Sequence, residues 1–393
     1  MGGPMIPELT SLVAEWTYRV MQVASPLSGH YEYVLGLQVY HHTVHSEAEM
    51  RDRVFHAPTR IEVDYLPELR GAHLAPYVAN PHGHEWVKVT DRCYAPTPER
   101  FVTGPRILLR EIPGNERLAA ALYAEQAYAN KAVILVRTLS ARPALAYLLA
   151  VLNSGLMYRY FLATSEKSRQ ALFPRLSLTT VRNLPIRIVD FSRPTASPVE
   201  QDLLSSCASA LESGDYDAPL ALASQALAAH AALHGPAGKP ELRDDPYWRE
   251  VIAGADTSFP GREDFVHDLL AALAQRMMDL NRDKHAETDR FVAWLERELR
   301  IEVEDLTRKT HIKGYPEADF TRLQEALQAN RRKLALPVDG LFGAQLSDEY
   351  EKSMALLRPL QEALTNTDRL IDQIVYRLYG LTEEEIAVVE GNA

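Results

Sequence analysis

Basic side chains are concentrated in one part of this sequence, between Arg100 and Asp190. The segment carries thirteen Lys and Arg against five Asp and Glu, a local charge of +8, whereas the 393-residue chain carries −11. Binding to phosphates requires clustered Lys and Arg, so the overall charge alone argues against a nucleic-acid partner. The distribution reverses that conclusion, because one basic surface with acidic flanks is typical of a protein that meets a polyanion on one side.

The most informative part of the basic segment is LNSGLMYRYFLATSEKSRQALFPRLSLTTVRNLPI at 152–186. Its Lys and Arg side chains cannot all be buried without partners at a tolerable cost, so several must be exposed. Interleaved Ser, Thr and Asn add donors for phosphates and for base edges. Core packing is the alternative for Tyr158, and an ion pair with Glu111 is the alternative for Arg110. We predict DNA contacts for Arg106, Arg110, Asn153, Ser154, Tyr158, Arg159, Lys167, Arg169, Arg175, Ser177 and Arg182.

No motif for methyl transfer is found in the sequence. An amino-methyltransferase needs an Asn/Asp-Pro-Pro-aromatic loop that accepts the exocyclic amine and stacks on the flipped base. The nearest string, Asn80-Pro81-His82-Gly83, lacks the second proline and the aromatic ring, and indicates a turn. A Gly-rich strand-to-helix loop for a cofactor is also missing, since GPAGKP at 235–240 has the wrong spacing. We therefore expect no catalytic residue and no cofactor in this chain.

Two groups of side chains were weighed as metal ligands. Asp348, Glu349, Glu351 and Lys352 have the composition of a metal-dependent nuclease site, but acids at the start of a helical stretch are ordinary complements of the helix dipole. His41 and His45 can share a metal if a helix places them on one face, yet the neighbouring VLGLQVY favours a strand. Surface histidines are the preferred interpretation, followed by DNA-contacting histidines, and we expect no metal site.

The basic segment lies in a region that is expected to be α+β. Short apolar, β-prone runs such as YEYVLGLQVY, RIEVDYLPEL, EWVKVT and RILLREI alternate with Gly, Pro and His over 28–112, as strands and loops do. The runs ERLAAALYAEQAYA and PALAYLLAVLNSGLMYRYFLA have the length and residue types of helices, with β-prone KAVILVRTL between them. We therefore predict an α+β, β-rich recognition domain over 1–190.

The rest of the chain is predicted to be helical. An Ala- and Pro-rich stretch over 191–261 is expected to form a helical connector. Within 262–393, Val266, Leu270, Leu273, Met277 and Leu280 are spaced by four and three, which places them along one face of a helix. A second apolar seam runs from Tyr350 to Leu378 and contains Pro359, which should kink or split that helix. We expect a scaffold of long packed helices that also contacts a partner.

The sequence resembles the TaqI-like specificity domain, which is found at the C-terminal end of Eco57I-type restriction-modification enzymes and of the adenine methyltransferases of phage-exclusion systems. The matching pieces follow the family's order: GLQVY at 36–40, LRGAHLAPY at 69–77, FVTGPRILLREIPG at 101–114, AYLLAVLNSGLMYRYF at 146–161 and FPRLSLTTVRNLPI at 173–186. The helices at 269–310 and the segment LIDQIVYRLYGLTEEEIAVVEG at 370–391 are also similar to these enzymes. The family's catalytic methyltransferase domain is not matched.

This resemblance implies a protein that recognises a sequence in double-stranded DNA and works with a methyltransferase or nuclease subunit, on which S-adenosylmethionine would bind. Two other functions stay open from the residues alone: a divergent metal-dependent nuclease, and an acidic protein that imitates DNA. Cys93 and Cys207 are too isolated for a disulfide framework, and no stretch approaches about 20 uninterrupted apolar residues. A cytoplasmic location is therefore expected.

Overall fold

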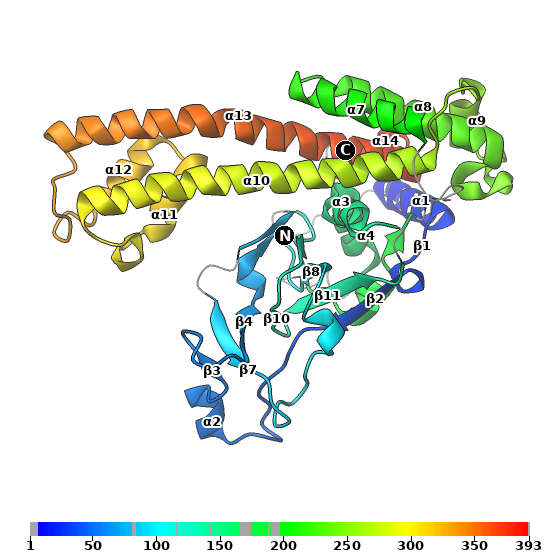
Figure 1. The fold of residues 1–393 in the computed structure, drawn as a ribbon. Coiled ribbons are helices and arrows are strands. Elements are labelled where there is room, and N and C mark those ends of the chain that lie inside the picture. The colour runs from blue at the N-terminus through cyan, green and yellow to red at the C-terminus, as the bar shows by residue number, and fades with distance from the viewer. Residues whose placement is uncertain are drawn as a thin grey trace. The chain divides into compact units, whose positions relative to one another are not determined.

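A computed structural model describes residues 7–80, 84–114, 116–140, 143–165, 174–187, 189 and 197–391 (Figure 1). The chain forms two compact units. Unit 1 contains residues 1–275 and 368–393, and unit 2 contains residues 276–367. These units are not three consecutive segments like the domains expected from the sequence. The physical reason is that the end of the last long helix belongs to unit 1, where Asp368 and Asp372 form ion pairs with Arg117.

The main sheet of unit 1 has four antiparallel strands in the order β2-β11-β8-β9. Apolar, mostly β-branched residues form the central pair, in which Leu135 lies opposite Leu108. Both faces of these strands are buried, so their sequences are continuous apolar runs without polar alternation. The bounds are β2 Tyr31–Leu35, β8 Arg106–Arg110, β9 Ala120–Tyr123 and β11 Val133–Thr138.

Three smaller sheets complete the β structure of unit 1. The largest has the order β10-β4-β7-β3, and the other two are the pairs β1-β12 and β5-β6. The strand after β2 that the sequence predicts over GLQVY is replaced by isolated bridges at Leu37 and Gln38. The backbone passes very close to the next strand there, since a side chain on Gly36 would lie 2.2 Å from the Asn130 carbonyl oxygen. The bounds are β1 Ser25–Pro26, β3 His56–Ala57, β4 Tyr65–Leu69, β5 Leu74–Ala75, β6 Val78–Ala79, β7 Glu85–Lys88, β10 Tyr128–Ala129 and β12 Pro185–Ile186.

Two helix predictions for the α+β region are wrong in detail. ERLAAALYAEQAYA contains β9 and β10. Ala120–Tyr123 pair with β8, and Ala120 and Ala121 are buried in the core, which overrides the helix preference of alanine. PALAYLLAVLNSGLMYRYFLA forms two helices, α3 (Leu145–Asn153) and α4 (Gly155–Thr164), bent by 64°. Ser154 lies at the break, where its hydroxyl accepts a hydrogen bond from the Met157 amide and caps α4.

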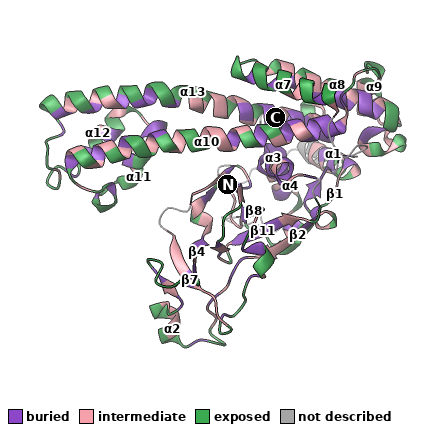
Figure 2. Cartoon of the chain, viewed as in Figure 1, coloured by how far each residue is buried: buried purple, intermediate pink, exposed green. Residues whose placement is uncertain are grey.

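The remaining helices of unit 1 pack partly on the sheets and partly on one another. Helix α3 packs on β8 and β9 and is almost entirely buried, as Figure 2 shows. The Ala-rich connector is helical as predicted. The bounds are α1 Pro7–Val23, α2 Glu47–Asp52, α6 Leu178–Arg182, α7 Pro198–Glu212, α8 Asp217–His234, α9 Pro246–Ala253 and α14 Glu383–Glu390.

Unit 2 contains the facing parts of two long helices, α10 (Glu263–Leu299) and α13 (Gly340–Tyr379), with α11 (Lys309–Lys313) and α12 (Phe320–Gln328) between them in the chain. Its core joins Phe291, Leu295 and Leu299 of α10 to residues of α12 and α13. The predicted seam of α10 is buried except at its last residue, Leu280, which is partly exposed. Helix α13 runs through Pro359, so the predicted split of this helix does not occur. The β-rich region followed by long packed helices confirms the fold class.

A search of the described residues finds no single helix that is long and apolar enough to span a membrane. Helices α3 and α4 together meet the criteria of length and composition, but as a bent pair.

Candidate nucleic-acid interface

Arg106, the first predicted DNA contact, is fully buried in β8. Its guanidinium donates to three backbone carbonyls, those of Gly104 (2.9 Å), Glu125 (3.0 Å) and Ala127 (2.9 Å). Burial lowers the pKa of Arg106 to about 10. The side chain ties β8 to the loop between β9 and β10, and it is therefore unavailable to DNA in this structure. The alternation of strand residues could not reveal this, because β8 is buried on both faces.

Asn153 and Ser154 are also fully buried, which removes them from the predicted interface. The Asn153 side chain accepts from the Ala120 amide (3.0 Å) and donates to the Ala120 carbonyl (3.0 Å), so it connects α3 to β9. The Ser154 hydroxyl donates to the Val151 carbonyl at 2.7 Å. Both residues have structural roles that their polar types alone do not distinguish from DNA contacts.

Ion pairs neutralise much of the positive charge that the sequence places between Arg100 and Asp190. The pairs join Arg100 to Glu32 (2.8 Å), Arg159 to Glu116 (3.5 Å), Arg175 to Glu111 (3.1 Å), Arg117 to Asp372 (2.7 Å) and Arg187 to Glu263. Three of these acids come from outside the basic segment. A count along the sequence therefore overestimates the free positive charge.

Two of the described cations without an ion pair lie at one end of the main sheet. Arg110, at the end of β8, and Lys131, just before β11, have no ion pair with any residue that the structure describes. They are neighbours because Arg110 lies opposite Val133 and the Glu111 amide donates to the Ala132 carbonyl at 2.9 Å. Arg175 joins them, since the Leu176 amide donates to the Glu111 carbonyl at 2.8 Å. We call Arg110, Glu111, Lys131 and Arg175 the sheet-end surface.

The other predicted contacts have varied positions. Arg182 and Ser177 are exposed on and next to α6, where Ser177 caps the helix, and Tyr158 is half-buried. Lys167 and Arg169 lie outside the described residues. The structure thus brings Arg110 and Arg175 together with Lys131, a residue that the sequence argument did not select. Only strand pairing places Lys131 beside Arg110, so no local sequence signal identifies it.

A row of three rings, two of which stack, lies close to Lys131. The His41 ring is 4.1 Å from that of Tyr94, nearly parallel at 14°, and 4.1 Å from that of His42. The Nδ1 atom of His41 accepts from the Thr43 amide at 3.3 Å. Partial burial, together with the nearby His42 and Lys131, lowers the pKa of His41, which favours an uncharged ring. Exposed aromatic faces beside a cation are suited to contact with nucleotides.

Comparison with known protein families identifies this part of the chain. Residues 66–186 match the model of the TaqI-like C-terminal specificity domain. The chain contains a TaqI-like specificity domain. This domain includes the whole sheet-end surface and implies DNA sequence specificity in a restriction-modification-type system.

The comparisons set bounds on the resemblance. Residues 36–65 lie outside the specificity-domain model, and so do the C-terminal helices at 269–310 and 370–391. Residues 266–375 match instead a domain of unknown function (DUF8810). No curated protein matches the chain.

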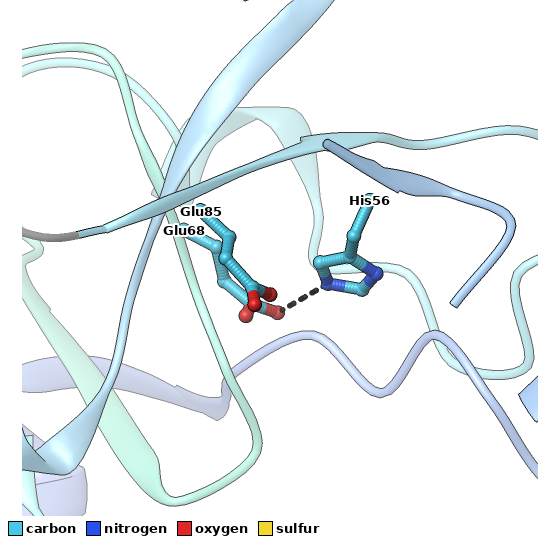
Figure 3. Close-up of side chains that lie close together, drawn as sticks. All are labelled: His56, Glu68 and Glu85. Carbon is cyan, nitrogen blue, oxygen red and sulfur yellow. Dashed lines mark ion pairs between the residues drawn. The ribbon is translucent and has the colours of Figure 1, made fainter. Parts of the chain in front are cut away.

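A possible metal-ligand cluster lies at the edge of the specificity domain, where β3, β4 and β7 contribute His56, Glu68 and Glu85 (Figure 3). The His56 Nε2 atom is buried and lies 3.4 Å from Glu68. Arginines already occupy the carboxylates, since Arg70 binds both Glu68 (3.1 Å) and Glu85, and Arg53 binds Glu85 (2.5 Å). Burial raises the pKa of Glu68, but His56 and Arg70 outweigh this effect and hold it below its usual range. A divalent ion would have to displace two guanidinium groups, so the cluster is better explained as an ion-pair network.

Two of the three acids considered for a nuclease site, Glu349 and Glu351, have structural partners. Glu349 pairs with Arg290 (2.6 Å) and Lys352 (3.6 Å), and Glu351 pairs with Arg358 (3.3 Å). All of these residues lie within helices of unit 2. In His41 and His45 the Nδ1 atoms have hydrogen-bond partners: that of His45 accepts from the His41 amide at 3.3 Å, and that of His41 lies 2.7 Å from the Thr43 hydroxyl.

The end of α13 is held against the specificity domain by a buried polar cluster within unit 1. Asp372 accepts from Arg117 (2.7 Å) and from the Gly155 amide (2.8 Å). A side chain on Gly155 would lie 2.5 Å from the Arg117 guanidinium, so only glycine fits there without displacement. Burial raises the pKa of Asp372 to about 7, although Arg117 opposes the shift. Sequence analysis missed this cluster, because Asp372 is 255 residues from Arg117 and 217 residues from Gly155 along the chain.

Proposed function

We propose that this chain is the non-catalytic DNA-recognition component of a restriction-modification or phage-defence methyltransferase system. The observation that carries the proposal is the specificity domain at 66–186 together with the unpaired cations at its sheet-end surface. The sequence contains neither the catalytic loop nor the cofactor loop of a methyltransferase, which supports the non-catalytic part.

In this proposal Arg110 and Lys131 bind backbone phosphates. Both residues lie in or next to paired strands, which hold their backbone in a fixed position. Phosphate contacts of this kind fix the register of a protein on the duplex. Arg175 is exposed but bonded to Glu111, so it must exchange this acid for a DNA acceptor. This exchange favours specific DNA sequences, because only a base edge with two acceptors for the guanidinium compensates for the lost ion pair with Glu111. Lys167 and Arg169, in the segment before Arg175, remain predicted contacts from the sequence.

The catalytic step would belong to a partner. We propose a methyltransferase or nuclease subunit of the same system, which would bind S-adenosylmethionine where methyl transfer is its chemistry. The long helices would support the specificity domain and contact this subunit. The site of action would be the cytoplasm, where the DNA of a cell with such a system lies.

Selection from a random duplex library, followed by mobility-shift titration at several salt concentrations, tests the proposal. We expect a preferred sequence to emerge, with the chain alone or with a co-expressed methyltransferase subunit. Lys131→Ala and Arg110→Ala should each weaken binding to all sequences and reduce the salt slope by about one unit. Arg175→Ala should cost about 1–3 kcal/mol on the preferred sequence and less on random DNA.

Arg249→Ala provides a control, because Arg249 is an exposed arginine of α9 whose guanidinium donates to the Asp244 carbonyl. It should leave the salt slope unchanged. The proposal fails if no sequence is enriched and the sheet-end variants bind DNA like the parent protein. Transfer of a labelled methyl group to DNA by the purified chain would contradict its non-catalytic part.

A further inference from the structure

Most cations of unit 2 have an acidic partner nearby. Lys309 and Lys313 share Glu304, which lowers the pKa of that carboxyl to about 2. Further pairs include Arg290 with Glu287, Arg282 with Asp279, Lys284 with Glu317 and Arg358 with Glu351. Surface charge in this unit is therefore largely balanced, as is usual for a solvated helical scaffold.

Arg300 is one of four exposed arginines that are exceptions to this balance. The others, Arg308, Arg331 and Arg332, are exposed and have neither an ion pair nor a side-chain hydrogen bond within the described residues. Lys333 is exposed as well, and its ammonium donates to the Asp305 backbone carbonyl at 2.8 Å. Unpaired exposed cations can bind an anion without first breaking a bond in the protein.

These cations are held on two adjacent segments by one buried side chain. The Asn330 amide oxygen accepts from the backbone N–H (2.9 Å) and the hydroxyl (2.9 Å) of Thr307, and its NH2 group donates to the Thr307 carbonyl at 2.7 Å. Residues 305–308 therefore lie beside residues 328–333. Thr307 and residues 328–333 line a hollow of about 450 Å³. Arg331, Arg332 and Lys333 line this hollow, and Arg308 directly follows the lining residue Thr307. Asp305 is the only acid in the two segments.

The hollow has the properties expected of a contact for a chain of phosphates. Its buried amide, Asn330, already bonds to Thr307 and to the Ala326 carbonyl, so it offers no free donor for a small enclosed anion. The four cations, which we call the rim, are exposed at the hollow or, for Arg308, next to one of its lining residues, and their long flexible side chains can follow neighbouring phosphates. Charge complementarity without a buried donor favours an extended polyanion over a small molecule.

We propose that Arg308, Arg331, Arg332 and Lys333 form a second DNA contact, which binds backbone phosphates independently of sequence. The inference rests on the proposed function of the chain and assigns a role to the part that matches a domain of unknown function. The specificity domain would supply the sequence preference, and the rim in unit 2 would add affinity for any duplex.

The test uses the full chain with the preferred duplex and with a scrambled duplex, each titrated by fluorescence anisotropy at several salt concentrations. We expect the variant Arg308→Ala/Arg331→Ala/Arg332→Ala to reduce the salt slope by about two to three units on both duplexes, since each B-DNA phosphate contact adds about 0.9. The ratio of the two affinities should not change. Replacement of the same three arginines by Gln, which retains side-chain length, should give the same loss.

The matched control removes three exposed cations of unit 2 that already have acidic partners: Arg282→Ala/Lys352→Ala/Arg358→Ala. It changes the net charge equally and should reduce the slope by less than one unit. Equal slopes for the rim variant and this control would overturn the inference, while a retained sequence preference would leave the proposed function intact. If the parent protein binds neither duplex, alone or with a co-expressed methyltransferase subunit, the proposed function itself fails. Calorimetry with inorganic phosphate tests for a small anion instead. If the parent protein binds phosphate saturably, the rim variant does not, and the salt slope for DNA is the same in both, the hollow binds a small anion and the DNA contact is overturned.

Discussion

Replacement of Asn153 by Ala separates a structural role from DNA contact at a residue that the sequence places at the interface. In the structure, Asn153 is buried and both of its polar atoms bond to Ala120. The Ala120 carbonyl also accepts from the Tyr77 amide at 2.8 Å, so it keeps a partner in the variant. The Ala120 N–H loses the partner that the side chain supplied. The variant should therefore lose stability while the DNA surface remains intact.

The magnitude follows from that difference. One buried N–H without a partner costs about 1–3 kcal/mol. The Ala120 carbonyl loses one of its two hydrogen-bond donors and keeps the other, which adds little to this cost. The free energy of unfolding, measured by urea titration with circular dichroism, should therefore fall by about 1–3 kcal/mol. Hydrogen exchange at the Ala120 amide should accelerate for the same reason. Asn183→Ala is the control, because Asn183 is exposed at the end of α6.

DNA binding gives the discriminating result. At temperatures where Asn153→Ala is folded, we expect its affinity and sequence preference to equal those of the parent protein. A variant with unchanged stability but without sequence preference would refute this reasoning, because it would show that Asn153 reaches a base edge. Arg106→Ala should likewise lower stability and leave DNA affinity and sequence preference unchanged, because the three partners of Arg106 are all backbone carbonyls.

Three further predictions concern the scaffold and the surface. Leu273→Ala should lower the free energy of unfolding by about 2–5 kcal/mol, because it replaces a large buried side chain by a small one. Leu356→Ala, at an exposed position of α13, should change this free energy little. Equal unfolding midpoints for the two variants would contradict the burial of Leu273 in the core. Because burial raises the pKa of Asp372 to about 7, the folded protein holds a proton more tightly than the unfolded chain, and stability should fall as the pH rises from about 4 to about 7. Asp372→Asn should flatten that part of the stability–pH curve, and an unaltered curve would show that another group causes it. Tyr94→Ala should weaken DNA binding by about 1–3 kcal/mol if the stacked rings contact a nucleotide, and an affinity equal to that of the parent would exclude the ring row from the interface.

The sequence determined the features that depend on short-range pattern. Apolar residues at intervals of three and four identified α10 and the Tyr350-to-Leu378 seam of α13, because helix periodicity repeats locally. The run KAVILVRTL identified β11 through its β-branched residues. The resemblance to the TaqI-like specificity domain was confirmed for residues 66–186, since it depended on several motifs in order and not on composition.

Tertiary structure decided which polar residues face solvent. Arg106, Asn153 and Arg175 are all polar residues of the basic segment, yet the first two are buried with hydrogen bonds to β9 and its flanking loop, and the third is exposed. Helix preference also failed at Ala120–Tyr123, because burial beside β8 outweighs an intrinsic preference of a few tenths of a kcal/mol per residue.

The candidate contacts themselves depend on distant partners. Whether a cation is free to bind phosphate depends on acids that can be hundreds of residues away, as Asp372 is for Arg117. Lys131 joins Arg110 only through strand pairing, and Arg331 and Arg332 join Arg308 only because Asn330 bonds to Thr307. The sequence therefore determined that a DNA-recognition domain is present and where its basic residues lie along the chain. Only the fold decided which of those charges remain unpaired, because pairing is set by distances in space and the sequence records only distances along the chain.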